Sequence, residues 1–468
     1  MRFLVIFSAV CVSLAAVGYL RAAEAAAKRT NVLFIMADDL NNDLGCYGSK
    51  VVKSPQIDRL ASHGVRFDRA YCNYPVCNCS RASMLSGRYT DRIGIVDNVT
   101  PPRKNLPDVV MLPEFFRKQR YVTRKVGKIF HTGDEFEDPR SWDIDIREDK
   151  TSKNPPKEQI VMEAGHVKIL RASDEETWDG KVARTAVQWL EECAQGEQPF
   201  FIAAGFRRPH TPYISPEKYY QLYDAEKLIP EVGPAEHLTH IPDLALTYKF
   251  PKQERFPQVD PGKIMAAYYG SVSFMDAQLG LLLDALDRLK LWDSTVVVFV
   301  SDHGYHLGEH GGLYHKMTLF EEGVRVPLII AAPGGARGQG ARGLVELVDL
   351  YPTLCELTGQ KGPDGLQGGS VAKQVAHPES DGKAQTLSVV SRGKNKTAVL
   401  QLDPKVMGRS LRTERWRYTL WPDGTQELYD HDVDPHEWTN LAVREESRAT
   451  VEGLRQKLAE MVQGIGRP

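Results

Sequence analysis

The stretch that decides the fold reads Asn31-Val32-Leu33-Phe34-Ile35-Met36, with Asp38-Asp39 just beyond it. A short apolar run of this kind predicts a buried strand. Two more buried strands are predicted at residues 199–204 and 295–300, and helical patterns lie between the runs. Strands that alternate with helices predict an α/β fold with a largely parallel sheet.

Helix signals accompany these strands. Ser54 is predicted to cap a helix that ends at Gly64. Apolar residues recur every three or four positions over residues 264–289, which predicts one long packed helix. Residues 345–357 predict another helix, with a kink or a restart at Pro352.

The C-terminal part has a different pattern. Residues 360–394 are rich in Gly, Pro and Lys and indicate a boundary. Residues 411–421 alternate and run into Pro422-Asp423-Gly424, which predicts a β-hairpin. With a strand at 427–430 and a closing helix at 445–462, we expect a small antiparallel sheet with one helix.

The N-terminus has the pattern of an export signal. A basic start, an apolar run from residue 3 to 20 and alanine-rich cleavage options predict a signal peptide at residues 1–27, with an anchor helix as the alternative. We expect a main domain at 28–390 and a C-terminal subdomain at 391–468. Residues 140–179 are polar and weakly patterned, and we interpret them as a long insertion or loop.

Charge and cysteine content do not point to a special class of protein. The net charge of −2, from 59 basic and 61 acidic side chains in 468 residues, gives no argument for a nucleic-acid or membrane partner. No stable membrane insertion is expected once the signal is cleaved. The irregularly spaced cysteines do not predict a disulfide scaffold.

Acidic residues follow two of the predicted strands. Asp38 and Asp39 come after the first, and Asp302-His303 comes after the strand at 295–300. In an open α/β sheet, ligand sites form at the carboxyl ends of parallel strands, so the two pairs converge if these strands are neighbours. Three carboxylates at one place need a cation, and oxygen ligands suit calcium or magnesium. Each pair taken alone is also compatible with an ordinary turn.

Residues 77–81 read Cys-Asn-Cys-Ser-Arg and begin a predicted helix. Unpaired backbone N–H groups and the helix dipole favour a thiolate or a bound oxyanion at Cys77. Arg81 lies one turn later, where it can hydrogen-bond whatever Cys77 carries. A purely structural cysteine is the alternative for this motif alone.

Basic side chains follow other apolar stretches. They are Lys128 and His131, then His210 in an Arg-Arg-Pro-His segment, and Lys316 after a Gly-rich stretch. Singly, each is compatible with a solvated surface residue. Together with the nucleophile and the acidic ligands, they predict a site for an ester of a tetrahedral oxyanion.

The chain resembles the type I sulfatases of the alkaline-phosphatase-like superfamily, from about residue 30 to the C-terminus, and among them the iduronate-2-sulfatase branch. The resemblance implies a large, mostly parallel sheet sandwiched by helices, and oxidation of Cys77 to formylglycine by a maturation enzyme. It also implies that the hydrate of this formylglycine attacks sulfur. It places one calcium ion among residues of the strand ends and the helix start, namely Asp38, Asp39, Cys77, Asp302 and His303.

The same resemblance assigns further roles. Arg81 supports the modified residue, and Lys128 and Lys316 hold sulfate oxygens. His131 deprotonates the remaining hydroxyl of the sulfated intermediate, and His210 protonates the departing sugar oxygen. The resemblance thus implies a sulfated saccharide as the substrate.

One residue supports the resemblance to the iduronate-2-sulfatase branch, and other positions depart from the family pattern. His303 stands where most sulfatases carry asparagine, and the iduronate-2-sulfatase branch carries histidine. Cys79 stands where the motif usually has Pro or Ala, which bears on which enzyme matures it. Tyr305 departs from the Trp of the human-type sequence, and residues 140–179, which do not obviously match, are where sugar specificity could lie.

Three functions follow as hypotheses. The first is a hydrolase for sulfate esters, of iduronate 2-sulfate or a related uronic acid, exported to the periplasm or medium of a bacterium or to an animal lysosome. The second is a phosphoester or phosphonate hydrolase on the same scaffold. The third is a glycan-binding protein that retains the site but is not matured because of Cys79.

Overall fold

The computed structural model describes residues 29–246, 259–393 and 402–466. The predicted signal peptide at 1–27 therefore lies outside the described residues. The centre of the fold is a large sheet with strand order β11-β2-β10-β9-β1-β7-β3-β4, to which β12 adds beside β2. Its strands are β1 Asn31–Asp38, β2 Val65–Tyr71, β3 Val122–Gly127, β4 Ile144–Ile146, β7 Phe200–Pro209, β9 Thr295–Ser301, β10 Arg325–Ala331, β11 Gln339–Ala341 and β12 Val345–Glu346.

The central strands run parallel, as predicted. β1 pairs with β9 on one side and β7 on the other, and β7 pairs with β3, all in parallel. β10 is the exception, because it runs antiparallel to both β9 and β2. The three predicted strands at the centre are confirmed, and they are buried along their whole length, which explains their unbroken apolar sequence.

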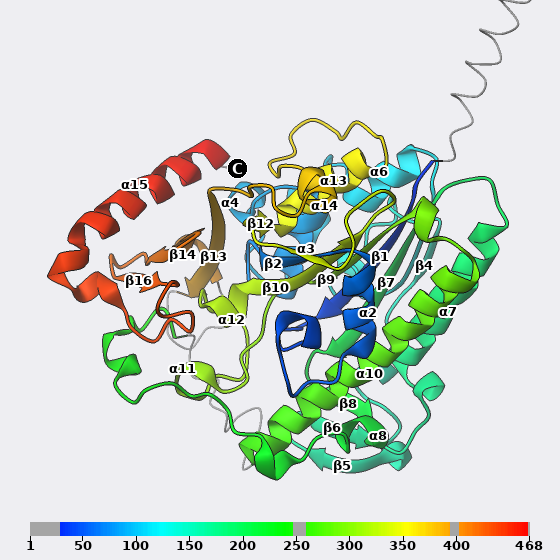
Figure 1. Ribbon diagram of the computed structural model, residues 1–468, viewed down its shortest axis with the longest axis horizontal. Coiled ribbons are helices and arrows are strands. Elements are labelled where there is room, and N and C mark those ends of the chain that lie inside the picture. Colours follow the sequence, from blue (N-terminus) through cyan, green and yellow to red (C-terminus); the bar gives the residue numbers. More distant parts are fainter. Residues whose placement is uncertain (1–28, 247–258, 394–401, 467–468) are drawn as a thin grey trace, which may run out of the picture.

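Helices cover both faces of this sheet (Figure 1). One hydrophobic cluster joins Phe34 of β1 to α3, α6 and α13. The other joins Leu33, whose side chain points the opposite way, to α2, α7 and α10. The α/β sandwich is therefore confirmed. The helices are α2 Pro55–His63, α3 Cys77–Ser86, α4 Thr90–Ile93, α5 Pro102–Asn105, α6 Leu112–Lys118, α7 Trp178–Ala194, α8 Glu217–Tyr220, α10 Pro261–Arg288, α11 Glu309–Gly312, α12 Glu321–Val324, α13 Leu350–Leu357, α14 Ala372–Ala376 and α15 Arg448–Ile465.

Two predicted helix details are wrong. Ser54 precedes α2, but its side chain does not cap the helix, and the carboxylate of Asp276 in α10 accepts from the first free N–H groups instead. The predicted helix at 345–357 is shorter, because β12 and a 3₁₀ turn occupy its first residues. Pro352 falls in the first turn of α13, where its missing N–H costs nothing.

The segment 140–179 is not the structureless loop that its composition indicates. It contains β4, β5 (Ile160–Ala164), β6 (Val167–Leu170) and the start of α7. β5 and β6 form a three-stranded sheet with β8 (Tyr213–Pro216) at the bottom of Figure 1. Its strands are short, and in β5 the half-buried and exposed positions alternate without a matching alternation of apolar and polar residues, so the sequence carries little periodic signal.

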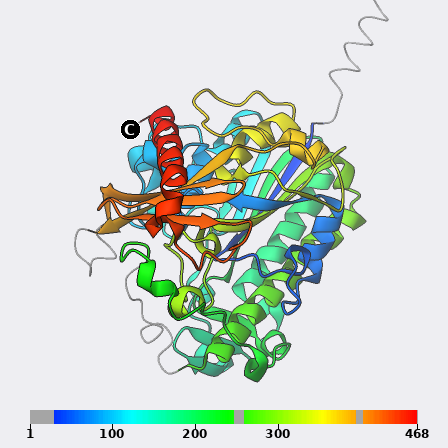
Figure 2. The ribbon, with the colours of Figure 1, turned by 60° about the vertical axis from the view of Figure 1, so that its left-hand side comes forward.

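The C-terminal antiparallel sheet is confirmed, in the order β13-β14-β15-β16. Its strands are β13 Gln385–Gly393, β14 Leu402–Thr413, β15 Trp416–Leu420 and β16 Gln426–Asp430. The predicted hairpin joins β15 to β16, and an additional turn divides the alternating run at Glu414. α15 lies along this sheet, where Leu454 and Leu458 are buried (Figure 2).

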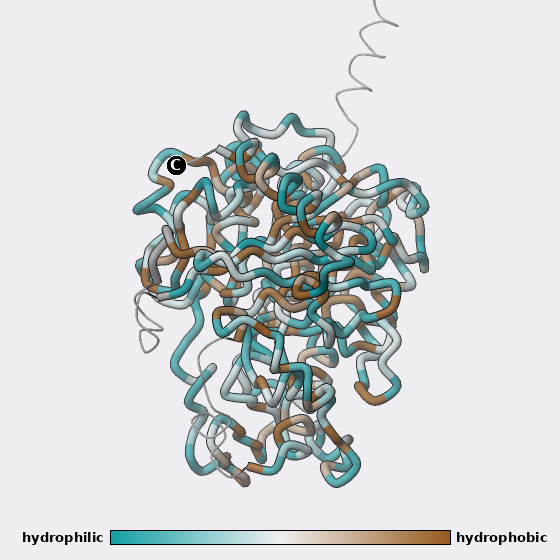
Figure 3. The backbone as a smooth tube through the Cα atoms, turned by 90° about the vertical axis from the view of Figure 1, so that its left-hand side faces the viewer, coloured by the Kyte–Doolittle hydropathy of each residue, from teal (hydrophilic) through white to brown (hydrophobic). Residues whose placement is uncertain are grey.

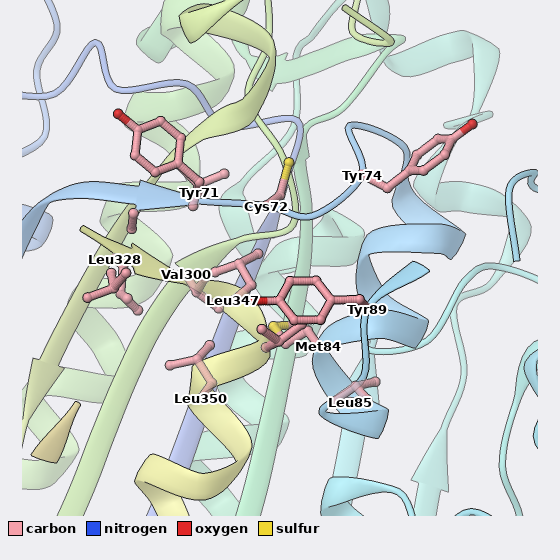
Figure 4. Packing of buried hydrophobic residues seen from close by; sticks show 14 of the residues in the cluster. Tyr71, Cys72, Tyr74, Met84, Leu85, Tyr89, Val300, Leu328, Leu347 and Leu350 are labelled. Carbon is pink, nitrogen blue, oxygen red and sulfur yellow. The ribbon is translucent and has the colours of Figure 1, made fainter. Parts of the chain in front are cut away.

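Every residue of α3 is buried. Figure 4 shows Met84 of α3 next to Leu347, and α3 also contacts α13; Met84, Leu85, Leu347 and Leu350 are all buried. Apolar segments likewise concentrate in the interior in Figure 3. This packing anchors the C-terminal end of α3 in the core. Across the described residues, every helix is too short or too polar to span a bilayer.

Candidate active site

The chemistry-bearing residues gather at the carboxyl edge of the central sheet. Asp38 ends β1, Asp302 follows β9, Lys128 follows β3 and His210 follows β7. These four strands are consecutive neighbours in the sheet, so their ends adjoin. The four residues meet because of the order of the strands in the sheet. The spacing of residues along the chain does not reveal that order.

Two glycines allow the backbones at the ends of β3 and β7 to approach each other closely. A Cβ on Gly127 would lie 2.1 Å from the carbonyl oxygen of Gly205, and Gly127 has a φ of +82°. A Cβ on Gly205 would lie 2.2 Å from the carbonyl oxygen of Lys128. Only glycine fits at both positions, and this close approach fixes the backbone from which Lys128 extends.

Arg81, buried in α3, joins the helix to the strand ends. Its Nε donates to Asp302 Oδ2 at 2.8 Å, and its terminal nitrogen donates to the carbonyls of Lys128 at 2.5 Å and Ile129 at 3.1 Å. The same guanidinium lies 3.5 Å from Asp38 Oδ1. The planar guanidinium group can donate to all of these acceptors at once, whereas the ammonium group of a lysine cannot.

Cys77 begins α3 and its thiol is fully buried at the centre of the group. The Sγ atom lies 3.4 Å from Asp38 Oδ1, 3.3 Å from His303 Nε2 and 3.4 Å from Lys316 Nζ. The structure thus brings the end of β1 and two residues that follow β9 around one sulfur atom. Cys79, two positions on, is a free thiol directed at the carbonyl of Asp97.

Two lysines contact the acidic residues. Lys128 Nζ donates to Asp38 Oδ2 at 2.5 Å, and Lys316 Nζ donates to Asp39 Oδ1. Burial alone would raise the pKa of Asp38, yet Lys128 and the other cations hold it well below its usual range. Burial alone would lower the pKa of Lys316, but Asp39, Cys77 and the other acidic groups together raise it. Asp38 is therefore ionised and Lys316 is charged.

His303 faces the same carboxylates. Its Nδ1 donates to the carbonyl of Gly304 at 2.9 Å, so Nε2 points to Asp39 Oδ1 at 3.3 Å and Asp302 Oδ1 at 3.6 Å. Burial lowers its pKa, but Asp302 and Cys77 together outweigh burial and raise the pKa to about 9. A proton or a metal ion at Nε2 is what balances the negative charge here.

The donor set fits a hard divalent cation. Asp38, Cys77, Asp302 and His303 each offer one ligand atom, all within 4.8 Å of one another, and Asp39 belongs to an overlapping group of the same kind. Asp39 Oδ2 is buried without a hydrogen-bond partner, in a residue with a φ of +64°. An orphaned carboxylate oxygen held in a strained backbone is a ready metal ligand. The imidazole is the less usual ligand for such an ion.

Two further histidines border the site. Burial and the charge of Lys128 lower the pKa of His131 to about 2. Burial also lowers the pKa of His210 well below its usual range, and the guanidinium of Arg207 lies 3.1 Å from its Nδ1. Both imidazoles are neutral at pH 7 in this arrangement. One ring nitrogen of His210 lies within 4.8 Å of a carboxylate oxygen of Asp38 and of Cys77 Sγ, so His210 belongs to the same cluster.

Sequence reasoning missed two side chains whose charges act on the Arg207 side of the site. Glu148 lies in the segment 140–179, whose composition indicates an insertion or loop. It accepts two hydrogen bonds from Arg207, at 2.8 and 2.9 Å. Lys153, from the same segment, is half-buried, and burial together with Arg207 lowers its pKa. Glu148 and Lys153 stand in a polar stretch without periodicity, so only the tertiary contact identifies them.

The α/β fold and the cluster of Asp38, Cys77, Asp302 and Lys128 at the carboxyl edge of its sheet are those of an alkaline-phosphatase-like hydrolase. The sulfatase family matches residues 30–360, and an N-sulphoglucosamine sulphohydrolase C-terminal family matches residues 308–464. The chain therefore belongs to the sulfatase family, whose reaction is the hydrolysis of sulfate esters.

Curated relatives match almost the whole chain. It is 30% identical to human iduronate 2-sulfatase, over 93% of this chain and 94% of the relative. It is also 30% identical to a sulfatase of Formosa agariphila, over 92% and 86% of the two chains. Human arylsulfatase K is 30% identical as well, over 90% and 80%. Relatives with different names at equal identity define the class of reaction and leave the sugar open.

Solved structures share the fold. The phosphonate monoester hydrolase of Agrobacterium radiobacter has a TM-score of 0.81 at 24% identity, over 94% of this chain and 96% of that one. A protein solved with its substrate D-glucosamine-2-N,6-O-disulfate has a TM-score of 0.75 at 21% identity, over 94% and 98%. At these identities the likeness concerns the fold alone.

Proposed function

We propose that this sulfatase removes the 2-sulfate of iduronate, or of a related uronic acid, from a sulfated saccharide. The observation that carries the proposal is the position of Cys77, whose Sγ lies 3.3 Å from His303 Nε2 and 3.4 Å from Lys316 Nζ at a helix N-terminus. The identity of 30% to human iduronate 2-sulfatase over nearly both full lengths supports the choice of sugar.

The proposal includes two groups. Formylglycine made from Cys77 would supply the nucleophilic hydroxyl, and calcium would polarise a sulfate oxygen. Asp38, Asp39, Asp302 and His303 would hold the ion together with residue 77, which suits the buried donor set and the orphaned Asp39 Oδ2. A separate maturation enzyme is required for the oxidation.

Each remaining side chain has a role that its position supports. Lys128 and Lys316 would hold sulfate oxygens, as fixed charges in a water-poor site that cost no reorganisation. His210, on the side of Arg207, would carry a proton to the departing sugar oxygen. His131, a neutral imidazole, would accept a proton from the hydroxyl at residue 77 so that sulfate can leave.

Lys153 is the side chain that we assign to the sugar carboxylate. It is half-exposed at the edge of the site, where the charges of Arg207, Lys128 and Asp38 all act on it. Among the described residues its ammonium group forms no ion pair or hydrogen bond, so it can receive an anion. Arg207 is less suited, because Glu148 already neutralises it.

Export is also part of the proposal and rests on the signal-like pattern of residues 1–27. The substrate would then be an extracellular, periplasmic or lysosomal polysaccharide.

The first test is the mass of the tryptic peptide spanning residues 70–81, from protein made in its native host. We expect an aldehyde in place of the Cys77 thiol. Cys77→Ala should abolish hydrolysis of a sulfate ester, while Cys193→Ala, a control for thiol loss far from the site, should not. Full sulfatase activity in Cys77→Ala would refute the mechanism.

The alternatives give different results in the same preparation. A phosphonate hydrolase, favoured only by the shared fold, would cleave a phosphonate ester faster than its matched sulfate ester. An unmatured binding protein would keep an intact thiol at residue 77 and bind sulfated glycan without turnover.

A further inference from the structure

The loop after β9 carries a second set of metal-ligating side chains. Residues 302, 303 and 316 of this loop belong to the site described above. His306 and His310 of the same loop group instead with Glu322 of α12, and one ligand atom from each of the three lies within 4.8 Å of the others. The catalytic proposal uses none of these three side chains.

His306 leaves one ring nitrogen without a partner. Its Nε2 is 2.6 Å from Thr318 Oγ1, and the ring is fully buried. Its Nδ1 is buried and makes no hydrogen bond, because the nearest acceptor, Glu309 Oε2, is 3.6 Å away. A buried ring nitrogen that faces a carboxylate across such a gap calls for a cation between them.

His310 presents a lone pair to the same place. The carbonyl of Trp438 lies 2.6 Å from His237 Nδ1 and can only accept, so Nδ1 of His237 carries the proton. In the neutral ring its Nε2 then accepts from His310 Nδ1 at 2.8 Å. This assigns the lone pair of a neutral His310 to Nε2, which faces Glu322 Oε2 at 3.1 Å.

No basic residue neutralises this group. In the described chain, neither Glu309 nor Glu322 forms an ion pair with a lysine or an arginine. The other His-and-Glu group, Glu321, His431 and Glu437, differs because Arg417 contacts both of its carboxylates. His306, His310 and Glu322 therefore converge at the first cluster, with Glu309 beside His306, and neither carboxylate pairs with a lysine or an arginine.

We propose that His306 Nδ1, His310 Nε2 and Glu322 form a structural zinc site, and that Glu309, whose Oε2 lies 3.6 Å from His306 Nδ1, turns inward as the fourth ligand. Nitrogen and carboxylate ligands in a group of four suit tetrahedral Zn²⁺, whereas two imidazoles disfavour calcium. Ligand atoms around zinc lie about 3.3 Å apart, so the three grouped atoms, now within 4.8 Å of one another, would contract on binding and Glu309 would move toward them. The outer hydrogen bonds to Thr318 and His237 already orient both rings, as partners of zinc-bound histidines do.

The proposed ion would brace the loop that carries Lys316. His306 N donates to the carbonyl of His315 at 2.9 Å, so the zinc ligand and the residue next to Lys316 are joined through the backbone. Through His237 and Trp438 the site also reaches the segment that follows the C-terminal sheet. With four protein ligands the site is closed, which fits a structural and not a catalytic ion.

The test is the metal content of the purified full-length protein after incubation with Zn²⁺ and gel filtration. We expect one zinc per chain that His306→Gln lowers at least about tenfold, since even the loss of an outer-shell partner costs 10- to 100-fold in affinity. His431→Gln, in the Arg-neutralised group, is the matched control and should keep the zinc. Asp39→Asn should keep it too, which separates this site from the catalytic one.

A second readout does not depend on the folding of a variant. Anomalous diffraction at the zinc edge, on crystals of the unaltered protein, should give a peak among His306, His310 and Glu322. Zinc content unchanged in a folded His306→Gln protein, or crystals soaked in Zn²⁺ without a peak at this cluster, would overturn the proposal.

Discussion

Arg81 Nε donates to Asp302 Oδ2 at 2.8 Å, and this bond joins the first turns of α3 to the end of β9. The two residues are separated by 221 positions, and both side chains are buried. The nucleophile candidate at residue 77 and the acidic end of β9 are therefore held by one charged contact. Their geometry depends on a guanidinium, because the same group also reaches two carbonyls after β3.

We predict that Arg81→Lys destabilises the protein by about 2–4 kcal/mol and removes most activity. A lysine keeps the charge but can satisfy only part of the buried acceptors, and each lost charged hydrogen bond costs about 1.5–3 kcal/mol. Urea unfolding followed by circular dichroism measures the loss. Arg92→Lys, at an exposed position, should stay within about 0.5 kcal/mol. Equal midpoints for the two variants would contradict the prediction.

Asp276 predicts a pH dependence of stability. Burial raises its pKa to about 7, although it accepts hydrogen bonds from Gln56 N and Ile57 N. The folded state therefore binds a proton more tightly than the unfolded state, where the pKa is near 3.8. Its contribution is full below pH 4 and is lost as pH rises through 7, by at most about 4 kcal/mol.

Asp276→Asn cannot ionise, so its free energy of unfolding should fall less steeply between pH 5 and pH 8 than that of the unaltered protein. Urea midpoints at several pH values measure the difference. Because other groups titrate equally in both proteins, the difference isolates residue 276. Parallel curves would show that Asp276 does not contribute.

Lys153→Met should raise KM for a uronic-acid sulfate with little change in kcat, if Lys153 receives the sugar carboxylate. The loss of an ion pair at a half-exposed site corresponds to about a 5- to 50-fold increase. A sulfated substrate without the carboxylate should show no such change. Lys150→Met removes an exposed charge from the same segment and serves as the control. An equal effect on both substrates would assign Lys153 to the sulfate.

Removal of the proposed calcium should lower activity by at least about 100-fold, since metal polarisation of an oxyanion supplies several kcal/mol. Dialysis against EGTA followed by a rate measurement tests this, with residual calcium measured by elemental analysis. Added Ca²⁺ should restore the rate and added Zn²⁺ alone should not. A calcium-free protein with full activity would exclude the ion from the reaction.

Local sequence was sufficient for the elements with strong patterns. Residues 31–36, 199–204 and 295–300 are buried on both faces, so they are apolar throughout and read as strands. The periodic run at 264–289 became α10, and Pro422-Asp423-Gly424 became the β15–β16 turn. The pattern failed at 140–179, where short, half-buried strands leave no clear alternation.

The sequence by itself determined which side chains stand at strand ends and at a helix start, because those positions depend on neighbouring residues. Only the tertiary structure decided that β9, β1, β7 and β3 adjoin, which brings Asp302, Asp38, His210 and Lys128 to one edge. It also decided the cap of α2 by Asp276 and the facing of His310 and Glu322. These contacts depend on how whole elements pack, and packing joins residues that no local pattern relates.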